Sequence, residues 1–270
     1  MTGPFDPQNY YNTLTTLYRS LFGENWHLGY WLNASNFAEA GDRLNGLMVS
    51  KLGVSSGDTV LDVGCGIGGP SCAISELTGC RVVGVTNSEA GVGVAREVRK
   101  RHGLEDAVEF QFADAVSLPF PDHTFDGLFS CEAIHNIVEK TSLARELSRV
   151  LKSAGAIVVG DLFLLRPLDR VSIDAEGLRS FSFHLFEAGE WIQILQDNGL
   201  RVIESVNIGH HVGAQSLEHC VETCSRRAAL APPNSLEQTI LNRTVAATTL
   251  LAEGFRAGDL GWGIWSGRKI

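Results

Sequence analysis

Short runs of apolar residues recur along the chain and alternate with segments in which apolar positions follow the helical repeat. Runs of this length, bounded by glycine or polar residues, are typical of strands. Strands are predicted at residues 59–63, 81–85, 108–112, 125–130, 156–160, 200–206 and 262–268. Helices are predicted between them at residues 70–78, 88–102, 141–152 and 189–198. This alternation predicts a mostly parallel sheet that helices cover on both faces.

Three segments depart from the alternation. Apolar residues at helical spacing predict a helix at residues 7–22, and a second is predicted at residues 36–51. Residues 214–254 are predicted to be helical, with a loop at Pro232 and Pro233. We therefore predict a single domain over residues 1–270, with a helical cap at 1–55, a core half at 56–163 and helical lid insertions at 164–187 and 208–258.

Charge and cysteine content limit the partners of this domain. The 270 residues include 22 Lys and Arg against 31 Asp and Glu, and the resulting charge of −9 repels phosphate backbones, so nucleic acid is not an expected partner. No apolar run reaches the roughly 18 residues of a membrane span, and the N-terminus lacks the features of a signal peptide. Six cysteines without paired or zinc-type spacing suggest reduced thiols, a cytoplasmic location and no metal.

A glycine-rich loop follows the first predicted strand, in the run Asp62-Val63-Gly64-Cys65-Gly66-Ile67-Gly68-Gly69. Glycines let the backbone approach a ligand because no Cβ intervenes. The spacing fits the dinucleotide pattern, but a nicotinamide enzyme places an acid at the end of the second strand, where this chain has Thr86-Asn87-Ser88. Asp62 before the loop instead suits a cationic amino-acid ligand, whose ammonium it would hold directly or through water.

The loop, the segment around Asp114 and the run Leu118–Asp126 together resemble the class I S-adenosylmethionine methyltransferases. The motif Gly23–Trp31 resembles the small-molecule branch, which includes the rebeccamycin sugar O-methyltransferase and the tocopherol and sterol C-methyltransferases. The resemblance implies a Rossmann-like sheet of seven strands, mostly parallel with the last strand antiparallel, and S-adenosylmethionine as cofactor with S-adenosylhomocysteine as product. The expected cofactor-binding residues are Asp62, Gly64, Gly66, Gly68, Thr86, Asn87, Asp114, Ala115 and Tyr30.

Two of these expectations have specific chemical reasons. The acid that many class I members place after strand two is missing, so Thr86 or Asn87 is expected to contact the ribose instead. Asp114 and Ala115 would lie beside the adenine, as the resemblance implies. The face of Tyr30 would attract the sulfonium through a cation–π interaction of about 0.5–2 kcal/mol.

A histidine and a carboxylate follow two later strands. His135 comes after the fourth strand and Asp161 after the fifth, and the carboxyl ends of parallel strands meet at one edge of the sheet. Imidazole has an unperturbed pKa of about 6.5 and can act as a general base. A neighbouring carboxylate can orient the ring and stabilise its charged form. In the rebeccamycin-like branch the matching residues serve the acceptor hydroxyl, so the resemblance implies that His135 and Asp161 are catalytic.

Aromatic residues near the lid insertions indicate an apolar methyl acceptor. The expected substrate-binding residues are Phe181, Phe183, Phe186 and Trp191. The predicted function is therefore methyl transfer to a hydroxyl of a hydrophobic small molecule, of the kind met in specialised metabolism. Two alternatives remain: a C-methyltransferase for an isoprenoid or alkene, and a protein that binds S-adenosylmethionine without methylating. The oligomeric state also remains open, with a homo-oligomer as one option.

Overall fold

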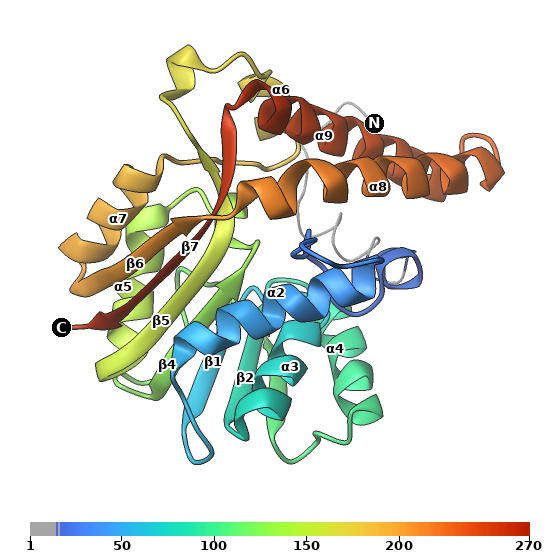
Figure 1. The fold of residues 1–270 in the computed structure, drawn as a ribbon. Coiled ribbons are helices and arrows are strands. Elements are labelled where there is room, and N and C mark those ends of the chain that lie inside the picture. Colours follow the sequence, from blue (N-terminus) through green and yellow to red (C-terminus); the bar gives the residue numbers. More distant parts are fainter. Residues whose placement is uncertain (1–14, 16) are drawn as a thin grey trace.

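A seven-stranded sheet forms the centre of the protein (Figure 1). The structure is a computed structural model that describes residue 15 and residues 17–270. The strands lie in the order β3-β2-β1-β4-β5-β7-β6. Their bounds are β1 Thr59–Val63, β2 Arg81–Thr86, β3 Val108–Phe112, β4 Phe125–Cys131, β5 Leu151–Leu164, β6 Leu200–Asn207 and β7 Leu260–Lys269. Neighbouring strands from β3 to β5 are parallel, whereas β7 is antiparallel to both β5 and β6. The predicted sheet, with its antiparallel last strand, is confirmed.

Helices cover both faces of the sheet because its strands are apolar on both faces. Helices α2, α3 and α4 pack on one face, and α5 and α7 pack on the other (Figure 1). Their bounds are α2 Phe37–Leu52, α3 Gly69–Thr78, α4 Glu89–Arg101, α5 Lys140–Val150 and α7 Ala188–Asp197. Each strand of the centre therefore contributes to two hydrophobic cores, one on each side.

Helix α2 belongs to one of these cores and not to a cap over the sheet. Its residues Leu44, Met48 and Leu52 have no exposed surface and pack with Val60 and Val158 of the sheet. Within the cap predicted at residues 1–55, helix α2 therefore lies against the face of the sheet. The apolar period of the helix does not reveal which surface its buried face meets.

Strand β5 is longer than the sequence predicts. It begins at Leu151, directly after the last residue of α5, and the expected strand began only at Ala156. Its pairing with β4 shifts register between Phe125 and Gly127, and Ala154 has a positive φ of 59°. Residues 152–155 therefore form an irregular extension at the start of the strand. A search for short apolar runs does not detect it, because these residues form no apolar run.

Two long helices lie across the carboxyl ends of the strands. Helix α8 spans Gly209–Leu230 and α9 spans Leu236–Ala257, and they run side by side (Figure 1). The loop predicted at Pro232 and Pro233 joins them. The insertion at residues 164–187 holds two short helices, η2 Leu168–Arg170 and α6 Ala175–Ser180.

The start of the described chain packs against these helices. Residues 17–22 are helical, and Tyr18 and Phe22 join a small apolar cluster with Cys224 and Leu241. The Tyr18 hydroxyl donates a hydrogen bond to Thr244 Oγ1 at 2.8 Å. The earlier part of the helix predicted at residues 7–22 lies outside the described residues.

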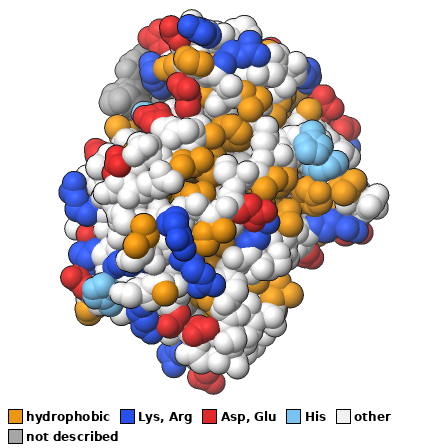
Figure 2. All heavy atoms as spheres, turned by 60° about the vertical axis from the view of Figure 1, so that its left-hand side comes forward, with side chains coloured by type: hydrophobic (Ala, Val, Ile, Leu, Met, Phe, Trp, Pro, Cys, Tyr) orange, Lys and Arg blue, Asp and Glu red, His pale blue; other side chains and the backbone are white. Residues whose placement is uncertain are grey.

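The outer surface carries both signs of charge. In Figure 2 the left-hand side of Figure 1 is turned toward the viewer. Acidic and basic side chains are interspersed on the face that this view shows. Within residue 15 and residues 17–270, no helix combines the length and the apolar character that crossing a membrane requires.

The packing of the core between the sheet and helices α5 and α7 predicts the effect of one substitution on stability. Trp191 of α7 has no exposed surface, and its ring centroid lies 5.6 Å from that of Phe186. Trp191→Ala should lower the free energy of unfolding by about 3–5 kcal/mol, because it removes buried contacts and leaves a cavity. Urea titration of both proteins measures this change.

A matched control lies on the same helix. Gln196→Ala changes an exposed position of α7 and should alter the free energy of unfolding by no more than about 0.5 kcal/mol. An equal, small effect of both substitutions would contradict the packing described for Trp191.

Candidate active site

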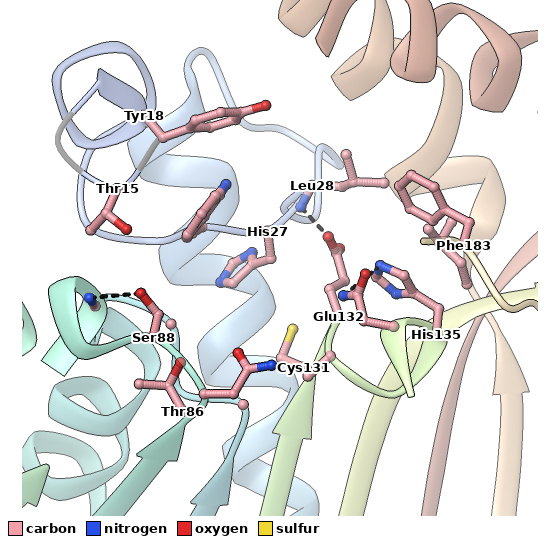
Figure 3. Close-up of a pocket in the computed structure, with 18 of the residues that line it drawn as sticks. Thr15, Tyr18, His27, Leu28, Thr86, Ser88, Cys131, Glu132, His135 and Phe183 are labelled. Carbon is pink, nitrogen blue, oxygen red and sulfur yellow. Dashed lines mark hydrogen bonds between the residues drawn. The ribbon is translucent and has the colours of Figure 1, made fainter. Parts of the chain in front are cut away.

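A cavity of about 310 Å³ lies at the carboxyl ends of β1, β2 and β4 (Figure 3). Its walls come from the glycine-rich loop, from the chain between residues 15 and 37, and from the lid helices α8 and α9. In a sheet of this kind, ligands bind in the crevice beyond the carboxyl ends of the strands. The cavity therefore occupies the place in which the sequence predicts cofactor and acceptor to meet.

Two glycines of the loop face this cavity. Gly64 and Gly66 have positive φ angles of 79° and 54° and line the cavity. A Cβ on Gly64 would lie 2.2 Å from the Cβ of Ala133, so no larger residue fits there. The loop thus keeps bare backbone at the cavity wall, as the approach of a ligand requires.

Two predicted cofactor residues lie beneath this loop. Gly68 does not line the cavity; a Cβ there would meet the Phe110 ring at 2.6 Å, so this glycine serves the packing of α3 on the sheet. Asp62 is 1% exposed, and the Ser71 hydroxyl donates a hydrogen bond to its Oδ2 at 2.5 Å. Burial raises the pKa of Asp62 to about 7. Contrary to the expectation, the Asp62 carboxylate does not face the cavity.

The ends of β2 and β3 contribute the polar wall on one side. Thr86, Asn87, Asp114 and Ala115 all line the cavity, and their contact with a ribose and an adenine stays a prediction. Ser88 also lines it and caps α4, where its Oγ accepts from the Gly91 amide at 3.0 Å. Sequence reasoning placed Ser88 after the strand but assigned it no role.

Tyr30 is separate from this wall. It is not among the residues that line the cavity, and its ring packs edge-on against His211, with centroids 5.2 Å apart. The predicted contact between its ring and a sulfonium therefore has no support in the structure. The position of an aromatic motif in sequence does not determine which face of the loop each ring covers.

His135 and Asp161 form a buried hydrogen-bonded pair. His135 lies in the short helix η1, Ile134–Asn136, and its Nδ1 is 2.6 Å from Asp161 Oδ1. The backbone amide of His135 donates to Asp161 Oδ2 at 3.0 Å, and the amide of Leu162 donates to Oδ1 at 2.7 Å. The carboxylate, which has no exposed surface, is thus fully engaged. A carboxylate oxygen accepts, so this hydrogen bond places a ring proton on Nδ1.

The other ring nitrogen of His135 is therefore the acceptor. The Asn136 side-chain amide donates to His135 Nε2 at 3.1 Å, and both residues line the cavity. The His135 ring stacks on Phe183, with centroids 4.8 Å apart and planes 13° apart (Figure 3). His135 thus lines the cavity with its ring held by Asp161 on one nitrogen and by Asn136 on the other.

The predicted aromatic residues divide into two groups. Phe181 and Phe183 line the cavity, beside Leu217, Ala247 and Leu251 of the lid helices. Phe186 and Trp191 instead belong to the core beneath, where Phe186 also packs against Trp265. The expectation that Phe186 and Trp191 contact the acceptor is therefore corrected, since buried aromatic residues in one segment can face either the cavity or the core.

Two further cavity residues come from chain segments far apart in sequence. Glu132 has a positive φ of 51°, and its Oε1 accepts from the Leu28 amide and from Trp262 Nε1, both at 2.9 Å. Burial raises the pKa of Glu132 to about 8. His27 lines the same cavity, and burial lowers its pKa to about 4. Figure 3 shows His27 between Ser88 and Glu132. No local pattern in the sequence assigned His27 a role.

Among the residues that the structure describes, no three His, Cys, Asp or Glu side chains converge as metal ligands. Cys220, which the sequence places one turn from Cys224, lines the cavity from α8. Burial keeps the pKa of the Cys131 thiol, at the end of β4, well above its usual range.

Comparison with known proteins identifies the family. A family model described as "Methyltransferase domain" matches residues 61–159. "Methyltransferase GfsG" of Streptomyces halstedii is 37% identical over 61% of this chain and 60% of its own length. The "27-O-demethylrifamycin SV methyltransferase" of Amycolatopsis mediterranei is 32% identical over 66% of this chain and 71% of its own length. The chain belongs to the S-adenosylmethionine-dependent methyltransferase family.

Two further similarities show the range of this methyltransferase family and its fold. The "Sterol 24-C-methyltransferase" of Eremothecium gossypii is 33% identical over 61% of this chain. The match spans 60% of GfsG and 44% of the sterol enzyme, so it covers less than two thirds of either relative. The crystal structure of the "[4+2]-Cyclase SpnF" has a TM-score of 0.82 at 24% identity, covering 97% of this chain and 94% of that one, and shows the same fold.

The buried Asp62 of this methyltransferase predicts how stability depends on pH. Its pKa rises from 3.8 to about 7, so the folded protein retains a proton that the unfolded chain releases above about pH 4. The free energy of unfolding should therefore fall as the pH rises from about 4 to about 7. In Asp62→Asn this contribution is absent, and the decline should be shallower. Urea titrations at about pH 5 and about pH 7 measure the difference.

Ser71 supplies the matched variant. Its hydrogen bond lowers the pKa of Asp62, so in Ser71→Ala the decline should extend to higher pH than in the unmodified protein. Identical pH dependence in all three proteins would contradict the assignment of a buried, protonated Asp62.

Proposed function

We propose that this methyltransferase transfers a methyl group from S-adenosylmethionine to a hydroxyl group of an apolar small molecule, with His135 as the general base. The observation that carries the proposal is the orientation of the His135 ring. Asp161 Oδ1 lies 2.6 Å from Nδ1, which leaves Nε2 as the proton acceptor at the cavity wall. A base within hydrogen-bonding reach of a hydroxyl can remove its proton as the oxygen attacks.

The residues present fit the proposed cofactor. Gly64 and Gly66 keep backbone at the cavity wall, and a Cβ at Gly64 would fill space that Ala133 occupies. Thr86, Asn87 and Asp114 offer polar groups to a ribose and an adenine. When bound, the cofactor supplies a methyl group that its sulfonium already activates. The chain therefore needs chiefly to position the acceptor, to exclude water and to take up one proton.

Positioning of the cofactor and the acceptor accounts for most of the expected rate acceleration. Holding two reactants in line lowers a barrier by about 7–11 kcal/mol, whereas a general base contributes about 10²–10⁴-fold. Phe183 stacks on the His135 ring and fixes its plane, and α8 and α9 cover the cavity from above. These contacts support a site in which the base adds to catalysis that positioning already provides.

The lining supports an acceptor that is apolar and carries no negative charge. Leu162, Leu217, Ala247 and Leu251 line the cavity together with Phe181 and Phe183. Within the described part of the chain, the acidic side chains on the wall are Asp114 and Glu132. Carboxylates there disfavour an anionic acceptor through repulsion, although the raised pKa of Glu132 weakens its part.

Carbon methylation is the second candidate. Two phenylalanine rings, Phe181 and Phe183, line the cavity and could face a developing carbocation, and the sterol 24-C-methyltransferase is among the relatives. Nuclear magnetic resonance of the product distinguishes the two reactions, since the new methyl group lies on oxygen in one and on carbon in the other. Tight binding of S-adenosylmethionine without methyl transfer would favour the third alternative, a protein that binds the cofactor without methylating.

The proposal predicts the phenotype of His135→Ala. The variant should lower kcat by about 10²–10⁴-fold, because the acceptor hydroxyl loses its base. Its affinity for S-adenosylhomocysteine should be unchanged. Formation of S-adenosylhomocysteine is followed with apolar probes that carry a hydroxyl group, among them 27-O-demethylrifamycin SV, the compound in the name of one relative.

His219→Phe is the control. His219 packs against the rings of Trp31 and Phe37 and does not line the cavity, so its replacement should leave kcat unchanged. The base assignment is wrong if His135→Ala methylates a hydroxyl probe at the rate of the unmodified enzyme.

A further inference from the structure

We propose that the side chain of Asn136 covers the basic nitrogen of His135 and that the hydroxyl group of a methyl acceptor displaces it. The proposal rests on the proposed function and deepens it, because it concerns the same nitrogen. It makes Asn136 a specificity-determining residue that favours acceptors with an O–H group over their methylated products. Three observations carry it: the single lone pair of Nε2, the fixed position of the His135 ring and the place of Asn136 in the cavity.

The hydrogen bonds of the His135 ring leave one lone pair for two donors. Nδ1 lies 2.6 Å from Asp161 Oδ1, and a ring proton belongs to that bond. In a neutral imidazole the other ring nitrogen then only accepts. Asn136 Nδ2 lies 3.1 Å from Nε2 and donates to it. An acceptor hydroxyl that gives its proton to Nε2 needs the same lone pair, so the two hydrogen bonds exclude each other.

Four contacts hold the His135 ring and its backbone in place. The ring bonds to Asp161 and stacks on Phe183, with centroids 4.8 Å apart, and the residue is 5% exposed. The backbone amide of His135 donates to Asp161 Oδ2 at 3.0 Å, and its carbonyl accepts from the His184 amide at 2.7 Å. Exchange of the amide for a hydroxyl therefore requires movement of Asn136 and not of the base.

Asn136 is the partner that can move. It is the last residue of η1, is partly exposed and lines the same cavity as His135. Rotation of its side chain about the Cα–Cβ bond between staggered positions carries the amide away from Nε2 without any change in the backbone. A hydrogen bond between neutral groups has a modest net free energy, because another donor can replace it. A bound hydroxyl can therefore take the place of the amide at little cost.

This exchange distinguishes the acceptor from its product. During transfer the hydroxyl proton passes to His135 Nε2, the new oxygen–carbon bond forms and the carbon–sulfur bond of the cofactor breaks. The resulting ether has no O–H group, so it has nothing to donate to Nε2 once that nitrogen has released its proton to water. The Asn136 amide then regains the lone pair. A compound without a donor that pushed the amide aside would leave Nε2 unpaired, which is unfavourable.

Nuclear magnetic resonance of the nitrogen-15-labelled protein tests the cover directly. The N–H···N bond between Asn136 and His135 should give a scalar coupling between the two nitrogens. With S-adenosylhomocysteine present, cyclohexanol should abolish this coupling, because its hydroxyl takes the lone pair. Methoxycyclohexane, the methyl ether of cyclohexanol, should leave the coupling in place. Binding of both probes is followed through the ring resonances of Phe183.

Three results of this experiment would overturn the proposal: no coupling before a probe is added, a coupling that persists when cyclohexanol is bound, and a coupling that both probes abolish. The first measurement needs no variant and no ligand. Failure of the unmodified protein to bind S-adenosylhomocysteine would count against the proposed function, whereas the coupling alone judges the cover.

Asn136→Ala separates the effect of the hydrogen bond from that of space. The variant should bind cyclohexanol about twofold to tenfold more tightly than the unmodified protein, the factor that corresponds to one net neutral hydrogen bond. Its affinity for methoxycyclohexane should be unchanged. Asn198→Ala is the matched control, because the Asn198 side chain donates to the Ile194 carbonyl at the end of α7 and does not line the cavity. It should bind both probes as the unmodified protein does.

Two results of the binding experiment would also overturn the proposal. Equal tightening of both probes in Asn136→Ala would mean that added space, and not the uncovered nitrogen, improves binding. No binding of cyclohexanol by either protein would mean that a hydroxyl group does not suffice to displace the amide. The coupling experiment on the unmodified protein decides the proposal if Asn136→Ala does not fold.

Discussion

The carboxylate of Asp161 holds the active site together. It lies within β5, has no exposed surface and accepts hydrogen bonds from the His135 ring, the His135 amide and the Leu162 amide. An isolated carboxylate at this depth would be costly, so its burial depends on these donors. The same bonds fix the turn after β4 and orient the His135 ring, whose Nε2 accepts from the Asn136 side chain. Loss of this group would thus disturb both the fold and the chemistry at one point.

This pair also connects the lid to the sheet. The amide of His184 donates to the His135 carbonyl at 2.7 Å, and Phe183 stacks on the His135 ring. Lys140 Nζ donates to the carbonyl of His184 at 3.0 Å and to that of Ile137. The segment that carries Phe181 and Phe183 is therefore held by the turn that carries His135. The shape of the cavity wall at Phe183 and the orientation of His135 are coupled through these contacts.

The sequence was informative where function depends on local order along the chain. The alternation of strands and helices predicted the sheet, because buried parallel strands must be apolar and bounded by breakers. Glycine spacing located the bare backbone at Gly64 and Gly66, and strand ends brought His135 to Asp161. Each of these features depends on the order of residues within one helix, strand or loop, or on the rule that the carboxyl ends of parallel strands lie at the same edge of the sheet.

Some side chains lie where the sequence did not predict them. Their positions depend on contacts between segments far apart in the chain, or on which face of an element the side chain occupies. Phe186 and Trp191 share an aromatic segment with Phe183 but turn into the core. Asp62 precedes the loop yet points beneath it, and Tyr30 packs against His211. His27 obtains its orientation from Asn45 and Asn25, a relation that appears only after α2 has packed on the sheet. No spacing rule contains such information.

A crystal structure with both S-adenosylhomocysteine and a methylated hydroxyl product bound tests the central claim most directly. The account predicts that the adenine lies beside Asp114 and the sulfur on the His135 side of the glycine loop. The product oxygen should then lie within about 3.2 Å of His135 Nε2, the reach of a general base. A complex in which that oxygen faces another side chain, with His135 still bonded to Asn136, would contradict the account.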